Sequence, residues 1–323
     1  MSSKRILLIH TGGTIGMTRT DHGFAPRDGV VEDEMARLLA SAHAGLSLKL
    51  LRLDPLIDSA NATPRDWNRI TAAIAEQHEK YDGFLITHGT DTLAYCAAAL
   101  TFALEGLNKP VILTGSMLPL TEPGSDGHRN LDDALTALGT AAPGVQVQFA
   151  GRLMHGARLR KTHSHSFDAF AAEPTNAPPL RPGAALIRHE YPCRDCAVLP
   201  VAPGGSGTVL SHAAAQCDGI VLRCFGSGTV PNTPAMEQAL RTAMDRAIPI
   251  IAVSQCPEGG IALGIYAAGA ILSRHGVVDG HDMTVEAAYA KLLLALGQGR
   301  DITAQRAFLA TPLCGEVSAA PPA

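Results

Sequence analysis

The sequence predicts an α/β protein with a larger amino-terminal domain, built on an open and mostly parallel sheet, and a smaller carboxy-terminal α/β domain. Apolar runs of strand length alternate with helix-length stretches, which is typical of parallel strands joined by helices. A proline-rich stretch from about residue 173 to residue 207 interrupts this alternation, which then resumes. We therefore expect an amino-terminal domain over 1–185, a Pro/Gly-rich linker over 186–207 and a carboxy-terminal domain over 208–323.

The first half carries five apolar runs that are bounded by turn residues, and we expect each to form a buried strand. They are Arg5–His10, Leu48–Leu53, Gly83–Thr87, Pro110–Thr114 and Val145–Ala150. Helices are expected between several of them. Thr63 is a good cap for one, with Pro64 in its first turn, and Asp91 or Thr92 begins another that runs to about Gly106.

The second half repeats the pattern over a shorter length. Gly219–Arg223 and Ile248–Val253 are expected strands, and Thr233–Ala247 and Met283–Leu296 are expected helices. The stretch before them has few periodic apolar positions and many prolines, which favours an extended connection between domains.

The composition excludes several classes of function. The 323 residues are 46% hydrophobic and 17% charged, enough for a sizeable core, and the net charge is −4 with scattered basic residues. A nucleic-acid surface would show a basic stripe, so no nucleic-acid partner is expected. The apolar run Ile6–Ile9 is shorter than the roughly 7–15 residues of a secretory signal. Leu93–Leu104 is too short and interrupted to span a bilayer, so we expect a cytoplasmic protein without membrane contact.

No metal and no organic cofactor are expected either. The seven cysteines form no framework pattern, and the C-x-x-C pair Cys193 and Cys196 has no second pair to complete a zinc site. We interpret them as free thiols. His163 and His165 lack an acidic partner nearby and are interpreted as ordinary polar residues.

Polar residues and glycines follow three of the expected strands. The segments are Thr11–Gly16 after the first strand, His88–Thr92 after the third, and Gly115-Ser116 with Ser125–Gly127 after the fourth. Ligands of open parallel sheets bind where such strand ends meet. Thr11–Gly16 fits neither G-x-G-x-x-G nor a P-loop, so a phosphate turn is disfavoured. His88–Thr92 is compatible both with a helix cap and with backbone N–H groups that stabilise an oxyanion.

T-G-G-T-I-G at 11–16 together with H-G-T-D-T at 88–92 resembles the paired signatures of the bacterial L-asparaginases. The resemblance covers nearly the whole chain. Further matching segments follow in the family's order: Leu56–Ser59, Gly115-Ser116, Ser125–Gly127, Arg160–Thr162 and Ser254–Cys256. Gly16-Met17 and His281–Ala287 are similar to the cytoplasmic subgroup rather than the secreted one.

The resemblance implies hydrolysis of L-asparagine through an acyl-enzyme on Thr14, with Thr90, Asp91 and Lys161 as the second catalytic group. A threonine hydroxyl needs a base to remove its proton, and a lysine disfavoured in its charged form by burial can serve. For the zwitterionic substrate, Asp91 is the expected ammonium partner. Ser59 matches the family's carboxylate-binding serine, and backbone groups at Asp58 and Gly89 are expected to assist.

The chain departs from the family pattern on the loop after the first strand, where Phe24 stands in place of the usual tyrosine. The ring is kept for loop closure, but the hydroxyl is lost. Some cytoplasmic members bind a regulatory asparagine between subunits. Arg223 and Cys256 match positions used there, whereas Arg160 stands where a small hydroxyl residue is usual. The resemblance also implies a homodimer or homotetramer.

Two alternatives stay open at this point. A glutaminase-asparaginase, or a hydrolase of another small amide, would carry the same motifs, because one methylene changes binding by only about 1–3 kcal/mol. A non-catalytic α/β module that binds an amino acid is the alternative from another class. The joint occurrence of Thr14, Thr90, Asp91 and Lys161 disfavours it.

Overall fold

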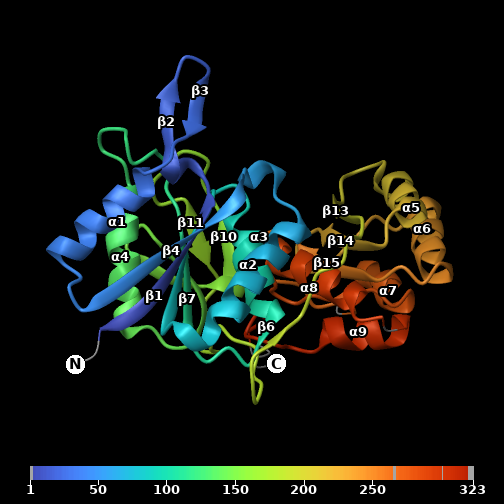
Figure 1. Cartoon of the computed structure of the whole chain (residues 1–323). Coiled ribbons are helices and arrows are strands. Elements are labelled where there is room, and N and C mark those ends of the chain that lie inside the picture. Colours follow the sequence, from blue (N-terminus) through green and yellow to red (C-terminus); the bar gives the residue numbers. More distant parts are fainter. Residues whose placement is uncertain (1–2, 265–266, 300, 319–323) are drawn as a thin grey trace. The chain divides into compact units, whose positions relative to one another are not determined.

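The computed structural model describes residues 3–264, 267–299 and 301–318, which form two compact units. The first unit runs to Ala172 and takes in Pro178–His189, and the second comprises Glu173–Ala177 and the chain from Glu190 onward. Each unit contains a largely parallel sheet with helices packed on it, so the predicted two-domain α/β class is confirmed (Figure 1).

The sheet of the first unit has six strands, of which the first five in spatial order run parallel and the last pairs antiparallel. The five expected strands are all present, and the strand expected at Leu48–Leu53 is longer at both ends. In spatial order the strands are β4 (Leu46–Ile57), β1 (Lys4–Gly12), β5 (Gly83–Thr87), β7 (Pro110–Thr114), β8 (Gly144–Phe149) and β9 (Arg152–His155).

Helices cover both faces of this sheet (Figure 1). α1 (Val30–Ser41) and α4 (Gly127–Thr140) bury their apolar stripes against alternate residues of β1, among them Ile6 and Leu8. α2 (Pro64–Gln77) and α3 (Leu93–Ala103) lie on the other face. Nearly every α3 side chain is buried, which is why the sequence there is apolar all round.

Of the two helix starts expected in this unit, that of α2 follows the expected capping chemistry. Thr63 caps α2 in a reciprocal capping box with Asp66, and Pro64 occupies the first turn. Thr92 stands at the cap position of α3, but its hydroxyl makes no capping bond and donates to the Ser59 carbonyl instead. The expectation that α3 continues to about Gly106 is wrong, because the chain leaves the helix at Leu104 to form β6 (Leu104–Glu105), which pairs with β12 (Ile187–Arg188).

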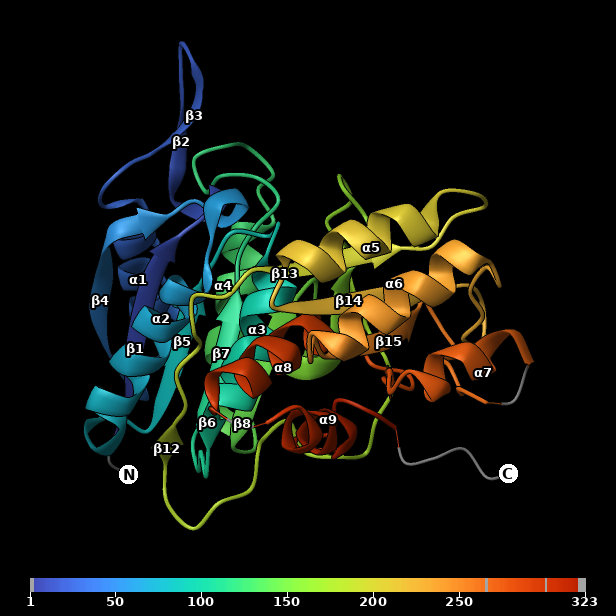
Figure 2. The same ribbon diagram turned by 90° about the vertical axis from the view of Figure 1, so that its right-hand side faces the viewer.

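Two antiparallel hairpins extend the first unit. β2 (Met17–Thr20) and β3 (Gly23–Pro26) form a hairpin that projects beyond the carboxyl ends of the parallel strands (Figures 1 and 2). Arg19 fastens it, with Nη2 2.9 Å from Glu122 Oε2 and the guanidinium carbon 5.0 Å from the centre of the Phe24 ring. The second hairpin pairs β10 (Leu159–Lys161) with β11 (Phe170–Ala172).

The second unit has a four-stranded parallel sheet in the order β13 (Cys196–Pro200), β14 (Gly219–Cys224), β15 (Ile250–Ser254) and β16 (Val278–Asp279). Its helices are α5 (Ser206–Gln216), α6 (Pro234–Asp245), α7 (Ala267–Arg274), α8 (Val285–Gly297) and α9 (Ile302–Ala310). As expected, Thr233 caps α6, whereas Thr284 caps α8 one residue later than the predicted start.

Residues 186–207, expected as a linker, contain β12, β13 and the first two residues of α5. Proline density hides a strand here because Pro200 lies at the end of β13, an edge position where a missing N–H costs no ladder bond.

In the second unit, α8 also holds a fully buried ion pair. Lys291 Nζ lies 2.6 Å from Glu316 Oε1 and 2.7 Å from the Thr311 carbonyl oxygen.

Short 3₁₀ turns complete the structure: η1 (Thr14–Gly16), η2 (Ser59–Asn61), η3 (His78–Lys80) and η4 (Gly156–Arg158). Over the described ranges, no helix combines the length and the apolar character that crossing a bilayer requires.

Candidate active site

The carboxyl ends of β1, β4 and β5 lie side by side at one edge of the larger sheet. Each strand is followed directly by one of the polar segments described in the sequence analysis. β1 leads into η1 with Thr14, β4 leads through Asp58 into η2 with Ser59, and β5 leads into His88–Asp91. This placement follows from parallel pairing, which puts all carboxyl ends at the same edge.

Two glycines let these segments touch. A Cβ built on Gly13 would lie 2.7 Å from Gly89 Cα, and Gly13 has φ +91°, a conformation that side-chain-bearing residues rarely adopt. A Cβ on Gly89 would overlap the Ser59 side chain. The backbones therefore approach within a distance that only glycine allows. Because Thr14 and Thr90 are the next residues along, the backbone segments that carry the two predicted threonines lie close together.

Lys161 joins this group from the hairpin of β10 and β11, as the last residue of β10. Its Nζ donates to Thr90 Oγ1 at 3.0 Å and to Asp91 Oδ1 at 2.9 Å. Thr90 is buried, with 7% of its surface exposed, and the Lys161 side chain is 21% exposed. Three of the four predicted catalytic residues thus form one hydrogen-bonded cluster, although Lys161 lies 71 residues from Thr90 and 70 from Asp91 in the sequence.

Asp91 has a second side. Its carboxylate is 63% exposed although it pairs with Lys161, so it keeps an open face for a further cation. This is compatible with the expected contact to a substrate ammonium group.

Thr14 occupies the first position of η1 and is half-buried. Gly13 precedes the turn, and the Gly16 N–H donates to the Gly13 carbonyl at 3.2 Å. The fourth predicted catalytic residue is therefore on a short, backbone-bonded turn rather than a long helix. That turn approaches the Thr90 segment through the contact of Gly13 with Gly89.

The two residues expected to bind the substrate carboxylate behave differently. The Ser59 side chain is buried against Gly89, and its carbonyl accepts from Thr92 Oγ1 at 2.8 Å. Asp58 is exposed, and its carboxylate accepts from the Ala60 N–H at 3.2 Å and from Asn61 at 2.7 Å. Asp58 thus shapes the turn that presents Ser59, which is ordinary Asx-turn chemistry.

A cavity of about 270 Å³ opens beside these residues. It is lined by His10, Gly12, Gly13, Gly16, Met17, Phe24, Pro26, Leu56, Ile57 and Asp58. The hairpin thus covers it on one side and the ends of β1 and β4 on the other.

Sequence reasoning had placed Phe24 near the nucleophile, but it missed His10. A histidine as the last side chain before T-G-G-T, at the end of an otherwise apolar strand, is the signal that could have found it.

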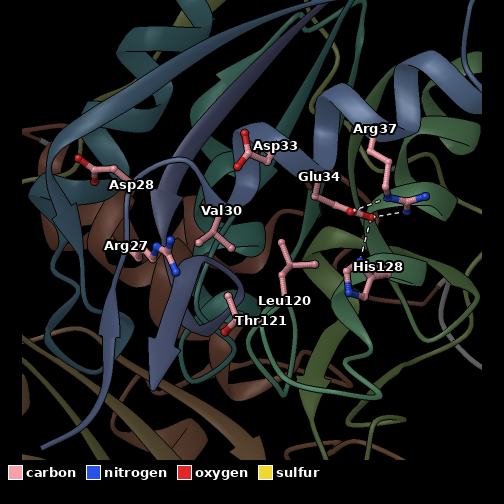
Figure 3. A pocket seen from close by; sticks show the side chains of 9 residues that line it. All are labelled: Arg27, Asp28, Val30, Asp33, Glu34, Arg37, Leu120, Thr121 and His128. Carbon is pink, nitrogen blue, oxygen red and sulfur yellow. Dashed lines mark hydrogen bonds and ion pairs between the residues drawn. The ribbon is translucent and has the colours of Figure 1, made fainter. Parts of the chain in front are cut away.

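Another hollow of about 330 Å³ lies beside the start of α1 and contains none of the predicted site residues. Figure 3 shows its buried Glu34 reaching toward Arg37 and His128. Glu34 Oε1 lies 2.6 Å from Arg37 and 2.9 Å from His128 Nδ1. Burial acts to raise the pKa of Glu34, but these hydrogen bonds outweigh it, and the net pKa is lowered. The cluster therefore holds a carboxylate that anchors α1 to α4.

Arg223 and Cys256, singled out as a regulatory pair, lie at the carboxyl ends of the adjacent strands β14 and β15 in the second unit. Cys256 is exposed, and Arg223 Nε is buried without a hydrogen bond. Elsewhere, His163 Nδ1 accepts from the N–H groups of His165 and Ser166, a local turn role. Across residues 3–264, 267–299 and 301–318, no group of three or more His, Cys, Asp or Glu could hold a metal ion.

Two family models match most of the chain. Residues 5–184 match the family described as asparaginase, N-terminal, and residues 195–309 match the glutaminase/asparaginase C-terminal domain. L-asparaginase 1 of Escherichia coli strain K12 is 38% identical over 336 residues, covering 98% of this chain and 99% of the relative. The L-asparaginase of Thermococcus kodakarensis is 36% identical over 332 residues, covering 97% and 99%.

Comparison with solved structures points to the same family. L-asparaginase I of Vibrio cholerae superposes with a TM-score of 0.86 at 35% identity, covering 98% of this chain and 100% of that one. The thermostable L-asparaginase of Thermococcus kodakarensis gives 0.85 at 33% identity, with coverage of 98% and 100%. The resemblance inferred from the two threonine motifs is confirmed: the chain belongs to the asparaginase family.

Proposed function

We propose that the chain hydrolyses L-asparagine to L-aspartate and ammonia, with Thr14 as nucleophile and Thr90, Asp91 and Lys161 as the supporting catalytic group. The observation that carries this assignment is the Lys161 ammonium group, bonded at 3.0 Å to the Thr90 hydroxyl beside the glycine contact that brings in Thr14. Family membership supports the amide substrate.

The reaction needs two displacements at one carbon. Thr14 Oγ1 bonds to the side-chain amide carbon, and the amide nitrogen leaves as ammonia after taking up a proton. A water molecule then attacks the resulting ester, gives one proton back to Thr14 Oγ1, and releases aspartate. The Thr90–Lys161 pair is suited to moving these protons, because its hydroxyl and amine are already within hydrogen-bond distance.

The substrate's charged ends determine where it binds. The exposed face of the Asp91 carboxylate suits the ammonium group, and Ser59 suits the carboxylate, helped by backbone groups at Asp58 and Gly89. The side chain of asparagine is one methylene shorter than that of glutamine, so we expect discrimination against glutamine of roughly 10- to 150-fold.

The test is ammonia release from asparagine and from glutamine over a concentration series. Thr14→Ala should abolish turnover while leaving the thermal unfolding midpoint close to wild type. Thr242→Ala, which removes an exposed threonine hydroxyl on α6, is the matched control and should leave turnover unchanged. Sustained turnover by Thr14→Ala would refute the assignment of the nucleophile.

By the same family resemblance, we propose a cytoplasmic protein that assembles as a homodimer or homotetramer. We also propose Arg223 and Cys256 as part of a regulatory asparagine site. Light scattering measures the assembly, and a sigmoidal dependence of rate on asparagine, made hyperbolic by Arg223→Gln, is expected from the regulatory site. A hyperbolic wild-type curve would count against regulation.

A further inference from the structure

His10 is a buried histidine for which the proposed reaction has no role. It lies near the end of β1, and its neighbours in the sheet register are Arg52 on β4 and Thr87 on β5. Only 4% of its surface is exposed. Buried ionisable groups of this kind cluster at functional sites.

The ring connects β5 to the nucleophile turn. Nδ1 lies 2.7 Å from Thr87 Oγ1. A Cβ built on Gly16 would lie 3.1 Å from Cε1 and 3.2 Å from Nε2 of the ring, so the imidazole packs directly against the turn η1 that begins with Thr14. Within the described part of the chain, Nε2 has no hydrogen-bond partner, and the ring lines the 270 Å³ cavity together with Gly13.

The charges around the ring come from three places. Arg52 extends from β4, Glu32 lies on α1, and Asp28 lies on the loop that leads to α1, where Figure 3 labels it. Burial is the largest influence and lowers the pKa of His10; Glu32 and Asp28 raise it, and Arg52 lowers it. The net pKa lies below the usual value of 6.5, so the ring is neutral at pH 7.

We propose that His10 is a positioning residue. While its imidazole is neutral, the ring holds the turn that carries Thr14 in place through its contact with Gly16; protonation of the ring displaces that turn and stops turnover. The proposal rests on Thr14 as the nucleophile. His10 acts through η1 and not on the reacting atoms.

The physical reason is the apolar packing around the turn. Ile15 and Val31 are buried there, and Val31 Cγ2 also lies within 3.4 Å of a Cβ built on Gly16. An imidazolium in this position would have one N–H directed at a cavity and the other at a single hydroxyl. A buried charge with so few partners draws in water or moves toward it. Because the ring packs directly against Gly16, either change shifts the turn that carries Thr14.

The expected change of stability and of rate with pH follows from the lowered pKa of His10. The neutral ring is the form that the fold favours, so the stability it contributes is present above about pH 6.5 and is lost as pH falls through the lower folded-state pKa. The rate profile of the wild-type enzyme should therefore show an acid limb below pH 6.5, governed by His10.

The test is the pH dependence of kcat and kcat/KM for asparagine at low ionic strength, in variants that change the charges around His10 without touching the ring. Arg52→Gln removes the charge that lowers the pKa of His10 and releases Asp28 from its ion pair, so the acid limb should move to higher pH by about 0.3 units. Glu32→Gln should move it to lower pH by a similar amount. Opposite shifts from two peripheral charges cannot result from a purely structural role.

Arg241→Gln and Glu76→Gln are matched controls, because they change the same charges at exposed residues that do not influence the pKa of His10, and they should leave the limb in place. His10→Gln, which retains hydrogen-bonding capacity toward Thr87 but does not titrate, should remove the limb. An unchanged limb in Arg52→Gln and Glu32→Gln, or a limb kept by folded His10→Gln, would overturn the proposal. Activity retained by Thr14→Ala would instead overturn the nucleophile, a separate result.

Discussion

Replacement of Lys161 by methionine tests the cluster that carries the assignment of the site. Methionine keeps an unbranched side chain of similar length but removes the ammonium group that bonds to Thr90 at 3.0 Å and to Asp91 at 2.9 Å. Thr90 would keep its place in the chain but lose its charged partner. We expect the variant to fold, because the Lys161 side chain lies at the site and not in the hydrophobic core.

The magnitude follows from the burial of each contact. A hydrogen bond between a buried hydroxyl and a charged group contributes about 1.5–3 kcal/mol, or roughly a 10- to 150-fold change in rate. The Asp91 carboxylate is 63% exposed, so its screened ion pair adds at most about 1 kcal/mol. If Lys161 also takes up a proton in the transition state, a further factor of about 10²–10⁴ is lost. The combined loss in kcat/KM should therefore exceed about 10³.

The assay is steady-state ammonia release, with thermal unfolding as the check on folding. Lys161→Arg separates the two contributions, because arginine keeps the charge but not the compact amine, and its loss should be intermediate. Lys49→Met removes an exposed lysine of β4 and is the matched control, with activity near wild type. If folded Lys161→Met stays within about threefold of wild type, the role given to this lysine is wrong.

Other predictions test the surroundings of the site and the second unit. Phe24→Tyr supplies the hydroxyl that the family usually carries on this loop and should raise kcat; an unchanged or lower kcat would show that the missing hydroxyl does not limit turnover. Gly89→Ala places a Cβ against the Ser59 side chain, so kcat/KM should fall by at least about 100-fold with little loss of folding, and wild-type kinetics would show that the contact relaxes freely. Lys291→Met leaves Glu316 charged and fully buried, so urea unfolding should show a loss of about 3–5 kcal/mol, largely recovered when Glu316→Leu is added; no recovery would mean that Lys291 acts through packing.

The sequence predicted the parts of this protein that depend on local pattern. Strands such as Gly83–Thr87 are continuous apolar runs because both faces are buried, and helix starts such as Thr63-Pro64 carry their own capping residues. Local pattern failed where pairing with distant chain decided the outcome. Leu104 leaves its helix for a partner at Arg188, and β13 forms inside a proline-rich stretch because its neighbour β14 supplies the hydrogen bonds.

By itself, the sequence determined the fold class, the family and the candidate site residues, because the alternation of apolar runs and the two Gly-Thr motifs at strand ends are local patterns of the chain. Tertiary structure alone decided which of them meet. Lys161 contacts Thr90, which lies 71 residues away in the sequence, because the pairing of β10 with β11 places it there. The burial of His10 and the charges around its ring were likewise decided by the register of β1, β4 and β5, since they depend on neighbours that are distant in the chain.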